Sequence, residues 1–217
     1  MIAKYTRKLN EHELNELNER KEEFEKGKRF IKNMFITIIV VILLTDVPLF
    51  IYYNRKDAFL WGLLVIASII FMYGIVAKKN IKKEKEMIDE INYAIEKNIV
   101  EASRYQPAAV VKLEEIEDEG SAYIFQLDEG KMLVLQGQEF YEDERFPNTD
   151  FELATVYGKN NKPIMFNKFV FGKKLEPIKI ISGKEKIKII ESDWYPIDKS
   201  EAVIDGNLNE MLQSGKI

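Results

Sequence analysis

The dominant pattern in this sequence is a pair of long apolar runs, residues 34–53 and 58–77, separated by the polar residues 54–57. Each run has about the 20 residues that a helix needs to cross a hydrocarbon core of roughly 30 Å. Asp46 is the only formally charged residue in either run. The pattern therefore predicts a transmembrane hairpin of two helices over residues 34–77.

Basic residues on both sides of this hairpin predict its orientation. Lys and Arg are frequent just before the first run and just after the second, whereas the intervening loop has only Arg55 and Lys56. Because Lys and Arg favour the cytoplasmic side, both termini are expected in the cytoplasm, in a multi-pass protein of the bacterial inner membrane. The first 33 residues are too charged for a cleaved signal peptide, so the first run itself would direct insertion.

Charged segments on both sides of the hairpin show helical periodicity. Residues 1–33 are expected to form a cytoplasmic amphipathic helix. Its helical pattern is seen from Asn10 onward, where Glu13 completes a capping box with Asn10. Residues 78–106 are expected to form a helical connector that continues to about Arg104 and ends before Pro107. Their apolar positions recur at intervals of three and four, which is typical of a coiled coil. The two helices could pair with each other as a cytoplasmic stalk, or each could pair with another copy of the protein.

From residue 107 onward the pattern changes to short runs rich in Val, Ile, Phe and Tyr, separated by turn residues. The runs are residues 109–116, 121–127, 132–137, 151–157, 164–171, 178–181 and 187–190. They predict a small antiparallel all-β barrel or sandwich over residues 107–217. A short helix at residues 208–212, capped by Asn207, is expected to close it. The predicted fold class is an α+β membrane protein.

Part of this β domain resembles known sequences. Residues 118–125 and 137–152, which include Tyr123 and the Phe146–Pro147 pair, are similar to a segment of uncharacterised bacterial proteins, several of them membrane-anchored. The resemblance implies a bacterial protein with a recurring C-terminal β domain. It implies no activity.

Within the predicted hairpin, Asp46 lies close to Pro48. An ionised carboxylate in lipid costs about 2.5–3.5 kcal/mol even on insertion scales, so a compensating group is expected, and Ser68 on the return helix is a candidate donor. Asp46 could respond to protons or cations, or set the oligomeric state. Alternatively, it could cap the helix locally where Pro48 disturbs it.

The residues available for catalysis are few. The chain has no cysteine and one histidine, His12, so thiol chemistry and histidine-based catalysis have little support. Carboxylates cluster at residues 114–119 and 142–144, at predicted turns where water would keep them ionised. No enzymatic activity, metal or cofactor is expected. The formal net charge of -4 and an excess of Asp and Glu over Lys and Arg after residue 107 argue against nucleic-acid binding.

The longest connection in the predicted β domain, residues 136–150, interleaves Phe140, Tyr141 and Phe146 with charged residues such as Arg145. Long loops on rigid sheets often carry binding residues. These side chains could contact a partner, or fold back to cover the end of the β domain. The leading hypothesis is a membrane-anchored, non-enzymatic β domain that binds a cytoplasmic protein or small ligand and forms homo-oligomers. The alternative is an ion- or proton-responsive oligomeric membrane component that uses Asp46.

Overall fold

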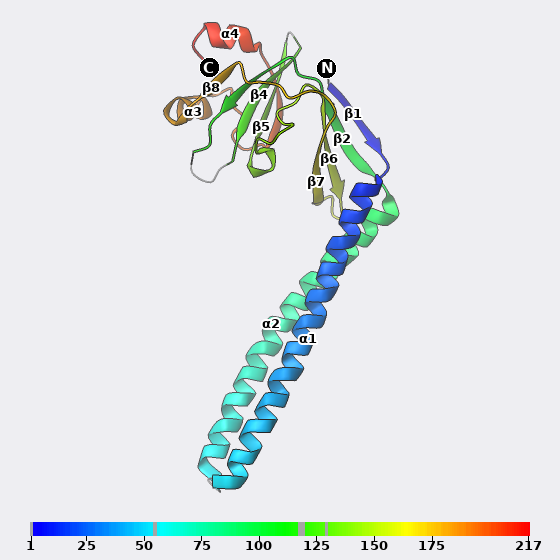
Figure 1. Cartoon of the computed structure of the whole chain (residues 1–217), viewed down its shortest axis with the longest axis vertical. Helices are drawn as coiled ribbons and strands as arrows, with labels where there is room; N and C mark the ends of the chain where they lie inside the picture. Colours follow the sequence, from blue (N-terminus) through cyan, green and yellow to red (C-terminus); the bar gives the residue numbers. More distant parts are fainter. Residues whose placement is uncertain (1, 54–55, 117–119, 129) are drawn as a thin grey trace. The chain divides into compact units, whose positions relative to one another are not determined.

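The computed structural model describes residues 2–53, 56–116, 120–128 and 130–217 (Figure 1). The side chains that it leaves out within these ranges are those of residues 28, 31, 38, 39, 41–43, 45–53, 56–66, 69, 70, 72, 73, 75 and 76. Over the described residues the chain forms nine β-strands and four α-helices. It divides into two compact units. We call Met1–Arg7, Val100–Thr155 and Phe166–Ile217 the β unit, and Lys8–Ile99 with Val156–Met165 the helical unit.

The helical unit contains two long helices, α1 (Glu11–Tyr53) and α2 (Lys56–Lys97), which lie side by side (Figure 1). The predicted capping box at the start of α1 is confirmed. The Asn10 backbone N–H donates to Glu13 Oε2 at 2.9 Å, and the Glu13 N–H donates to Asn10 Oδ1 at 2.9 Å. Leu17 of α1 and Ile91 of α2 are buried, so these members of the two predicted seams pack within the chain.

α2 ends at Lys97, earlier than the predicted end near Arg104. Asn98 follows with a φ of 53°, the left-handed conformation that often terminates a helix, and its side chain accepts a hydrogen bond from the Leu9 N–H at 2.9 Å. The chain then continues as strand β2 (Val100–Tyr105). The predicted helical connector over residues 98–104 is therefore wrong.

The membrane prediction is also corrected. Over the residues described, none of the helices has a segment whose length and apolar character would let it cross a lipid bilayer. The predicted α+β membrane fold with a transmembrane hairpin at 34–53 and 58–77, and the predicted multi-pass inner-membrane location with both termini cytoplasmic, are therefore wrong. α1 and α2 both continue beyond the apolar runs into charged segments with ion pairs such as Glu22–Lys26 and Lys82–Glu86.

The first sheet has the strand order β1-β2-β6-β7, with β1 (Ile2–Arg7), β6 (Phe151–Tyr157) and β7 (Pro163–Val170). β1 pairs antiparallel with β2, and β2 pairs antiparallel with β6. Residues 2–7 were assigned to the N-terminal amphipathic helix, and that assignment is wrong. Their alternation of Tyr5 and Arg7 with smaller residues suits a sheet, but their partner strand lies far along the chain.

The second sheet has the order β8-β3-β4-β5-β9. Its strands are β3 (Ala109–Leu113), β4 (Ala122–Asp128), β5 (Lys131–Gln136), β8 (Lys179–Ile181) and β9 (Glu201–Asp205). β8 runs parallel to β3, so the sheet is mixed, whereas a purely antiparallel arrangement was predicted. β9 was not predicted.

Two short helices accompany this sheet, α3 (Gly183–Ile190) and α4 (Leu208–Gln213). α4 confirms the predicted C-terminal helix. As predicted, Asn207 caps it: the Asn207 side chain accepts hydrogen bonds from the N–H groups of Asn209 and Glu210.

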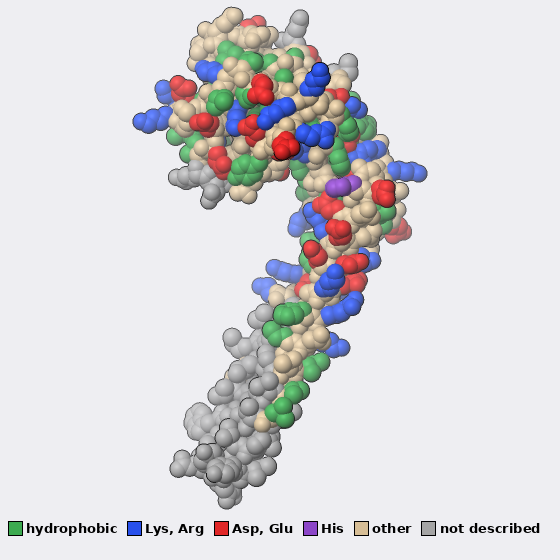
Figure 2. Space-filling model, viewed as in Figure 1, with side chains coloured by type: hydrophobic (Ala, Val, Ile, Leu, Met, Phe, Trp, Pro, Cys, Tyr) green, Lys and Arg blue, Asp and Glu red, His purple; other side chains and the backbone are tan. Residues whose placement is uncertain are grey.

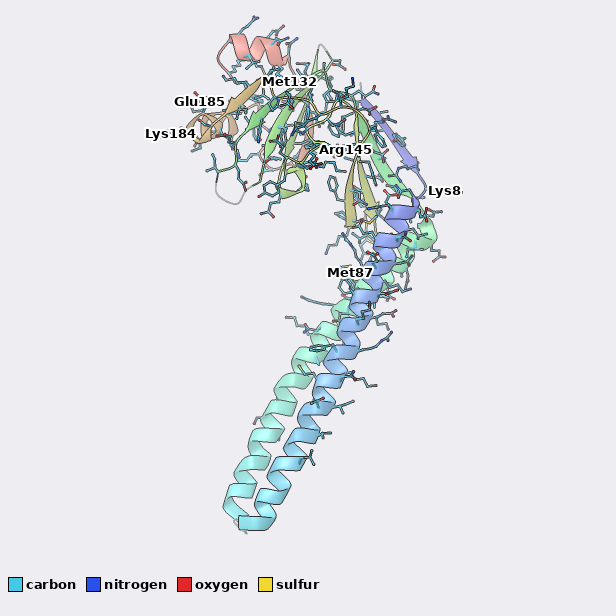
Figure 3. All side chains as sticks on the ribbon, viewed as in Figure 1. Lys8, Met87, Met132, Arg145, Lys184 and Glu185 are labelled. Carbon is cyan, nitrogen blue, oxygen red and sulfur yellow. The ribbon has the colours of Figure 1, made fainter. Side chains whose placement is uncertain are left out.

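The strand predicted at residues 187–190 is wrong, since these residues belong to α3. In α3, Lys186 and Ile189 are three residues apart and both buried, whereas Lys184 and Glu185 are exposed (Figure 3).

The second sheet is covered on both faces. On one face Tyr123 and Phe125 join a core with Phe151 and Leu153 of the first sheet. On the other face Ile124 and its neighbours pack against residues of α3 and α4, including Ile189 and Leu208. The predicted all-β domain is therefore a layered arrangement of sheet, sheet and helices. β4 and β5 are consequently buried almost throughout.

Candidate functional site

The candidate site is the connection from β5 to β6, residues 137–150, which we call the 137–150 loop. It begins with the short 3-10 helix η2 (Gln138–Phe140). Phe140 and Phe146 are buried in the core between the two sheets, whereas Tyr141 is 44% exposed. The Phe146 ring packs edge-on against Tyr123 at 5.4 Å. Two of the three aromatic residues of the loop thus cover the core, and one is presented to solvent.

A buried amide connects this loop to the segment that follows β7. Asn148, which is fully buried, accepts hydrogen bonds at Oδ1 from the N–H groups of Asp150 at 2.9 Å and Gly172 at 3.0 Å. Its Nδ2 donates to the Arg145 carbonyl at 2.9 Å. A Cβ at Gly172 would lie 2.8 Å from the backbone nitrogen of Asp150, so the two backbone segments approach more closely than a residue with a side chain would allow.

Asp143 organises the middle of the loop. Its Oδ1 accepts hydrogen bonds from the Arg145 N–H at 2.7 Å and the Phe146 N–H at 2.8 Å, and Lys168 of β7 lies 3.2 Å from Oδ2. Burial raises the pKa of Asp143, but these two backbone donors and the Lys168 charge outweigh it, so the pKa is lowered overall. The carboxylate therefore stays ionised and holds the turn closed.

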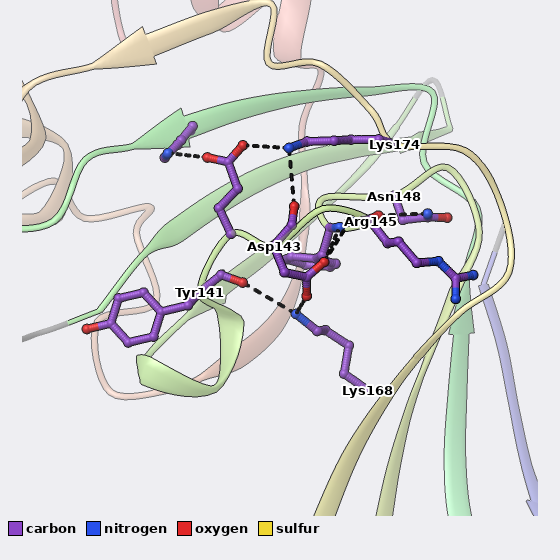
Figure 4. Close-up of polar contacts among 9 residues, drawn as sticks. Tyr141, Asp143, Arg145, Asn148, Lys168 and Lys174 are labelled. Atoms are coloured by element: carbon purple, nitrogen blue, oxygen red, sulfur yellow. Dashed lines mark hydrogen bonds and ion pairs between the residues drawn. The ribbon is translucent and has the colours of Figure 1, made fainter.

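Lys168 also contacts the aromatic core. Its ammonium lies 3.9 Å from the centroid of the Phe146 ring, a distance suited to a cation–π interaction, and only 14% of its side chain is exposed. Desolvation lowers the pKa of Lys168, with Asp143 acting in the opposite direction. Lys168 thus fixes both Asp143 and Phe146 from a neighbouring strand (Figure 4).

Glu142 is held between two lysines from separate segments. It accepts from Lys112 of β3 at 2.5 Å and from Lys174 at 2.9 Å, and Lys174 also donates to the Asp143 carbonyl at 3.2 Å (Figure 4). The hydrogen bonds from Lys112 and Lys174 lower the pKa of Glu142. Both carboxylates at the centre of the loop are therefore held in the ionised form, which suits binding rather than proton transfer near neutral pH.

The exposed residues of the loop are themselves positioned. The Tyr141 hydroxyl donates to Glu115 Oε1 at 2.7 Å, and Glu115 also accepts the Gly120 N–H at 3.1 Å. Arg145 donates from Nη2 to the Val170 carbonyl at 2.7 Å. The Tyr141 ring and the Arg145 side chain are thus presented on a surface of defined shape.

Four of the predicted site residues, Phe140, Tyr141, Arg145 and Phe146, come together in this loop. The residues that hold this loop in place, Lys112, Lys168, Lys174 and Asn148, were not identified from sequence. These lysines lie on other strands and segments, so no local pattern marks them. Asn148 could have been suspected from its place in an Asn-Thr-Asp turn, where Asn side chains often bond to nearby backbone.

The predicted intramembrane residues do not form a describable site. The side chains of Asp46 and Pro48 in α1 lie outside the described residues, and Ser68 is exposed on α2. Residues 117–119 of the first acidic cluster are likewise outside the description. Among the side chains that are described, no group of three or more His, Asp or Glu residues is arranged to hold a metal ion.

Comparison with known proteins adds no constraint on function. No protein-family model, no curated protein and no solved structure matches the chain. The similarity to uncharacterised bacterial proteins over residues 118–125 and 137–152 stays a prediction.

Proposed function

We propose that this chain is a non-enzymatic binding protein whose β unit contacts a protein partner through the 137–150 loop. One observation carries the proposal: Tyr141 is 44% exposed on a loop in which Phe140 and Phe146 are buried and Glu142 and Asp143 are held by ion pairs. A rigidly held tyrosine ring that is accessible to solvent belongs to the residue types that contribute most to binding energy at protein interfaces.

The rigidity of the loop supports this proposal. Asp143, Asn148 and Glu142 each make several hydrogen bonds or ion pairs, so the loop would lose little conformational entropy on binding. Tyr and Arg are the residue types most enriched among side chains that dominate binding energy at protein interfaces. Tyr141 and Arg145 provide one of each.

The charge of the surrounding surface favours a protein over a nucleic acid. Acidic and basic side chains are intermixed on the face of the β unit shown in Figure 2, and the whole chain carries a formal charge of -4. A phosphate backbone would meet ionised carboxylates at Glu142 and Asp143. A protein surface with both signs of charge could pair with this pattern.

A carboxylate-dependent enzyme is the competing class. Acid–base catalysis by two carboxyl groups needs one of them to have a raised pKa, so that it carries a proton near neutral pH. The pKa values of Glu142 and Asp143 are both lowered, which favours the binding proposal.

Site-specific photocrosslinking in cells tests the proposal. A photoreactive phenylalanine analogue is placed at position 141 of the full chain, and at position 187 as a control. Ile187 belongs to α3, on the other face of the second sheet, and has a comparable exposure of 45%. We expect a discrete crosslinked protein from position 141 that is absent from position 187 and is reduced by Arg145→Ala. Identical products at both positions, or no product at 141, would overturn the proposal.

A further inference from the structure

The charged residues of the helical unit are separated along its two long helices. Residues 11–25 of α1 include seven acidic and two basic residues, and residues 84–97 of α2 include five acidic and two basic residues. In contrast, all eight charged residues within 26–33 and 78–83 are Lys or Arg. We call 11–25 with 84–97 the acidic segment, which has a formal charge of -8, and 26–33 with 78–83 the basic segment, which has a formal charge of +8.

The antiparallel pairing of α1 and α2 places like charges beside each other (Figure 1). Near one end of the pair the Leu9 N–H donates to the Asn98 side chain at 2.9 Å, and further along a Cβ on Gly27 would lie 3.5 Å from Glu84 Oε1. Gly27 and Glu84 therefore mark the same level of the two helices. The boundary between the acidic and the basic segment falls close to this level on both helices.

Ion pairs within one chain balance these charges only weakly. The pairs that the structure shows across the boundary join residues four apart on the same helix, namely Glu22 with Lys26, Glu25 with Arg29, and Lys82 with Glu86. Solvent-exposed pairs of this kind contribute little to stability. Neighbouring charges of one sign repel each other, so in a single copy each segment is destabilised by its own charges.

Groups near the boundary also lack cover within one chain. Phe30 of α1 is 68% exposed and Ile81 of α2 is 37% exposed, and both belong to the basic segment. The Glu84 Oε2 atom is buried, but among the described residues it has no hydrogen-bond partner. A second pair of helices on this region would cover the two apolar side chains and bring further cations near this carboxylate.

We propose that two copies of this chain bind each other through their helical units, side by side and antiparallel, with the acidic segment of each copy against the basic segment of the other. Only an antiparallel pair joins opposite charges, because a parallel pair would place like charges together. The pair has a two-fold axis near Gly27 and Glu84, so its two contacts are identical. This interface goes beyond the protein-binding surface of the 137–150 loop and does not depend on it.

Sedimentation equilibrium of the full chain at two salt concentrations tests whether charge holds the dimer together. We expect a dimer at about 0.05 M NaCl, with a dissociation constant that rises at least about tenfold at about 1 M NaCl, where the Debye length is only about 3 Å. A monomer at both salt concentrations, or a dimer with the same dissociation constant at both, contradicts the proposal.

Two charge-reversal variants test the contact between the segments. Lys79→Glu with Lys83→Glu alters the exposed surface of the basic segment, and Glu19→Lys with Glu23→Lys alters that of the acidic segment. Each double variant should dimerise at least about tenfold more weakly, because like charges then meet in both contacts, and an equimolar mixture of the two should dimerise more strongly than either alone. The control, Lys179→Glu with Lys184→Glu on exposed positions of the β unit, should dimerise as wild type.

The orientation is tested with spin labels, because the chain has no cysteine and single-cysteine variants take one label each. In the dimer, labels at Lys26→Cys should lie close together near the axis. Labels at Glu11→Cys should lie about 45 Å apart, since roughly 15 residues of helix separate each label from the axis. Equal distances at the two positions, or a mixture of the two charge-reversal variants that dimerises no better than either alone, rules out the antiparallel dimer.

Discussion

Asn148 determines the course of the 137–150 loop through three hydrogen bonds. Its side chain satisfies the N–H groups of Asp150 and Gly172 and the carbonyl of Arg145, all away from bulk water. A hydrophobic residue of similar size could fill the same space but would leave these backbone groups without partners. The residue therefore acts through hydrogen bonding rather than through apolar packing.

We expect Asn148→Ala to lower the free energy of unfolding by about 1–3 kcal/mol, because buried backbone groups lose their partners. Urea unfolding followed by tryptophan fluorescence or circular dichroism measures the change. Asn209→Ala, on the exposed face of α4, is the matched control and should change stability by less than about 0.5 kcal/mol. Equal effects of the two substitutions would contradict this account of Asn148.

Among the elements, β1 shows how the first residues of the chain are held in the first sheet. Arg7 lies 2.7 Å from Glu152 of β6, and the Tyr5 hydroxyl also donates to this carboxylate. Glu152 is only 5% exposed, and these two side chains bind its carboxylate. Burial and the hydrogen bond to Glu152 raise the pKa of Tyr5, which keeps its hydroxyl protonated as a donor.

Arg7→Met should therefore destabilise the protein by about 3 kcal/mol, since a buried carboxylate loses its cationic partner. The double variant Arg7→Met with Glu152→Gln should recover part of this loss, because the uncompensated charge is then absent. Unfolding midpoints of the single and double variants measure the coupling. Simple additivity of the two substitutions would show that the ion pair contributes little.

At the scale of the whole molecule, acid stability reflects several carboxylates of the β unit. The pKa values of Glu142, Asp143 and Asp150 are all lowered, and for Asp150 the main cause is the hydrogen bond from Arg104. A carboxyl group with a lower pKa in the folded state adds stability above its unfolded pKa, which is about 4. That contribution disappears as the pH falls through the lowered folded values.

We therefore expect the urea midpoint to stay nearly constant from about pH 7 to pH 5 and to fall steeply below about pH 4. Glu142→Gln should lower stability at neutral pH and make the acid-induced loss smaller, because one of the linked carboxyl groups is removed. Unfolding curves at a series of pH values measure both effects. An unchanged pH dependence in Glu142→Gln would show that its ion pairs with Lys112 and Lys174 do not contribute.

The membrane interpretation also failed at the scale of the whole molecule. Two apolar runs of suitable length predicted a hairpin in lipid, but over the described residues no helix qualifies as a span. α1 and α2 extend well beyond the runs, with 43 and 42 residues, into the charged segments that were also predicted to be helical. What the sequence did predict correctly here is that two consecutive helices lie side by side.

Features that depend on neighbouring residues were determined by the sequence itself. The Asn10–Glu13 capping box and the Asn207 cap involve groups within three residues of each other, so their geometry follows directly from the helix. Short apolar runs bounded by turn residues likewise predicted β4, β5 and β6 within one residue of their observed ends.

Only the tertiary structure decided the features that join distant segments. β1 and β2 form because residues 2–7 pair with residues 100–105, and the apolar run at 187–190 is helical because Ile189 packs on the second sheet. Lys112, Lys168 and Lys174 reach the 137–150 loop from other strands and segments. Local propensities differ by only about 1 kcal/mol per residue, so long-range packing and ion pairing select among conformations that the local sequence leaves nearly equal in energy.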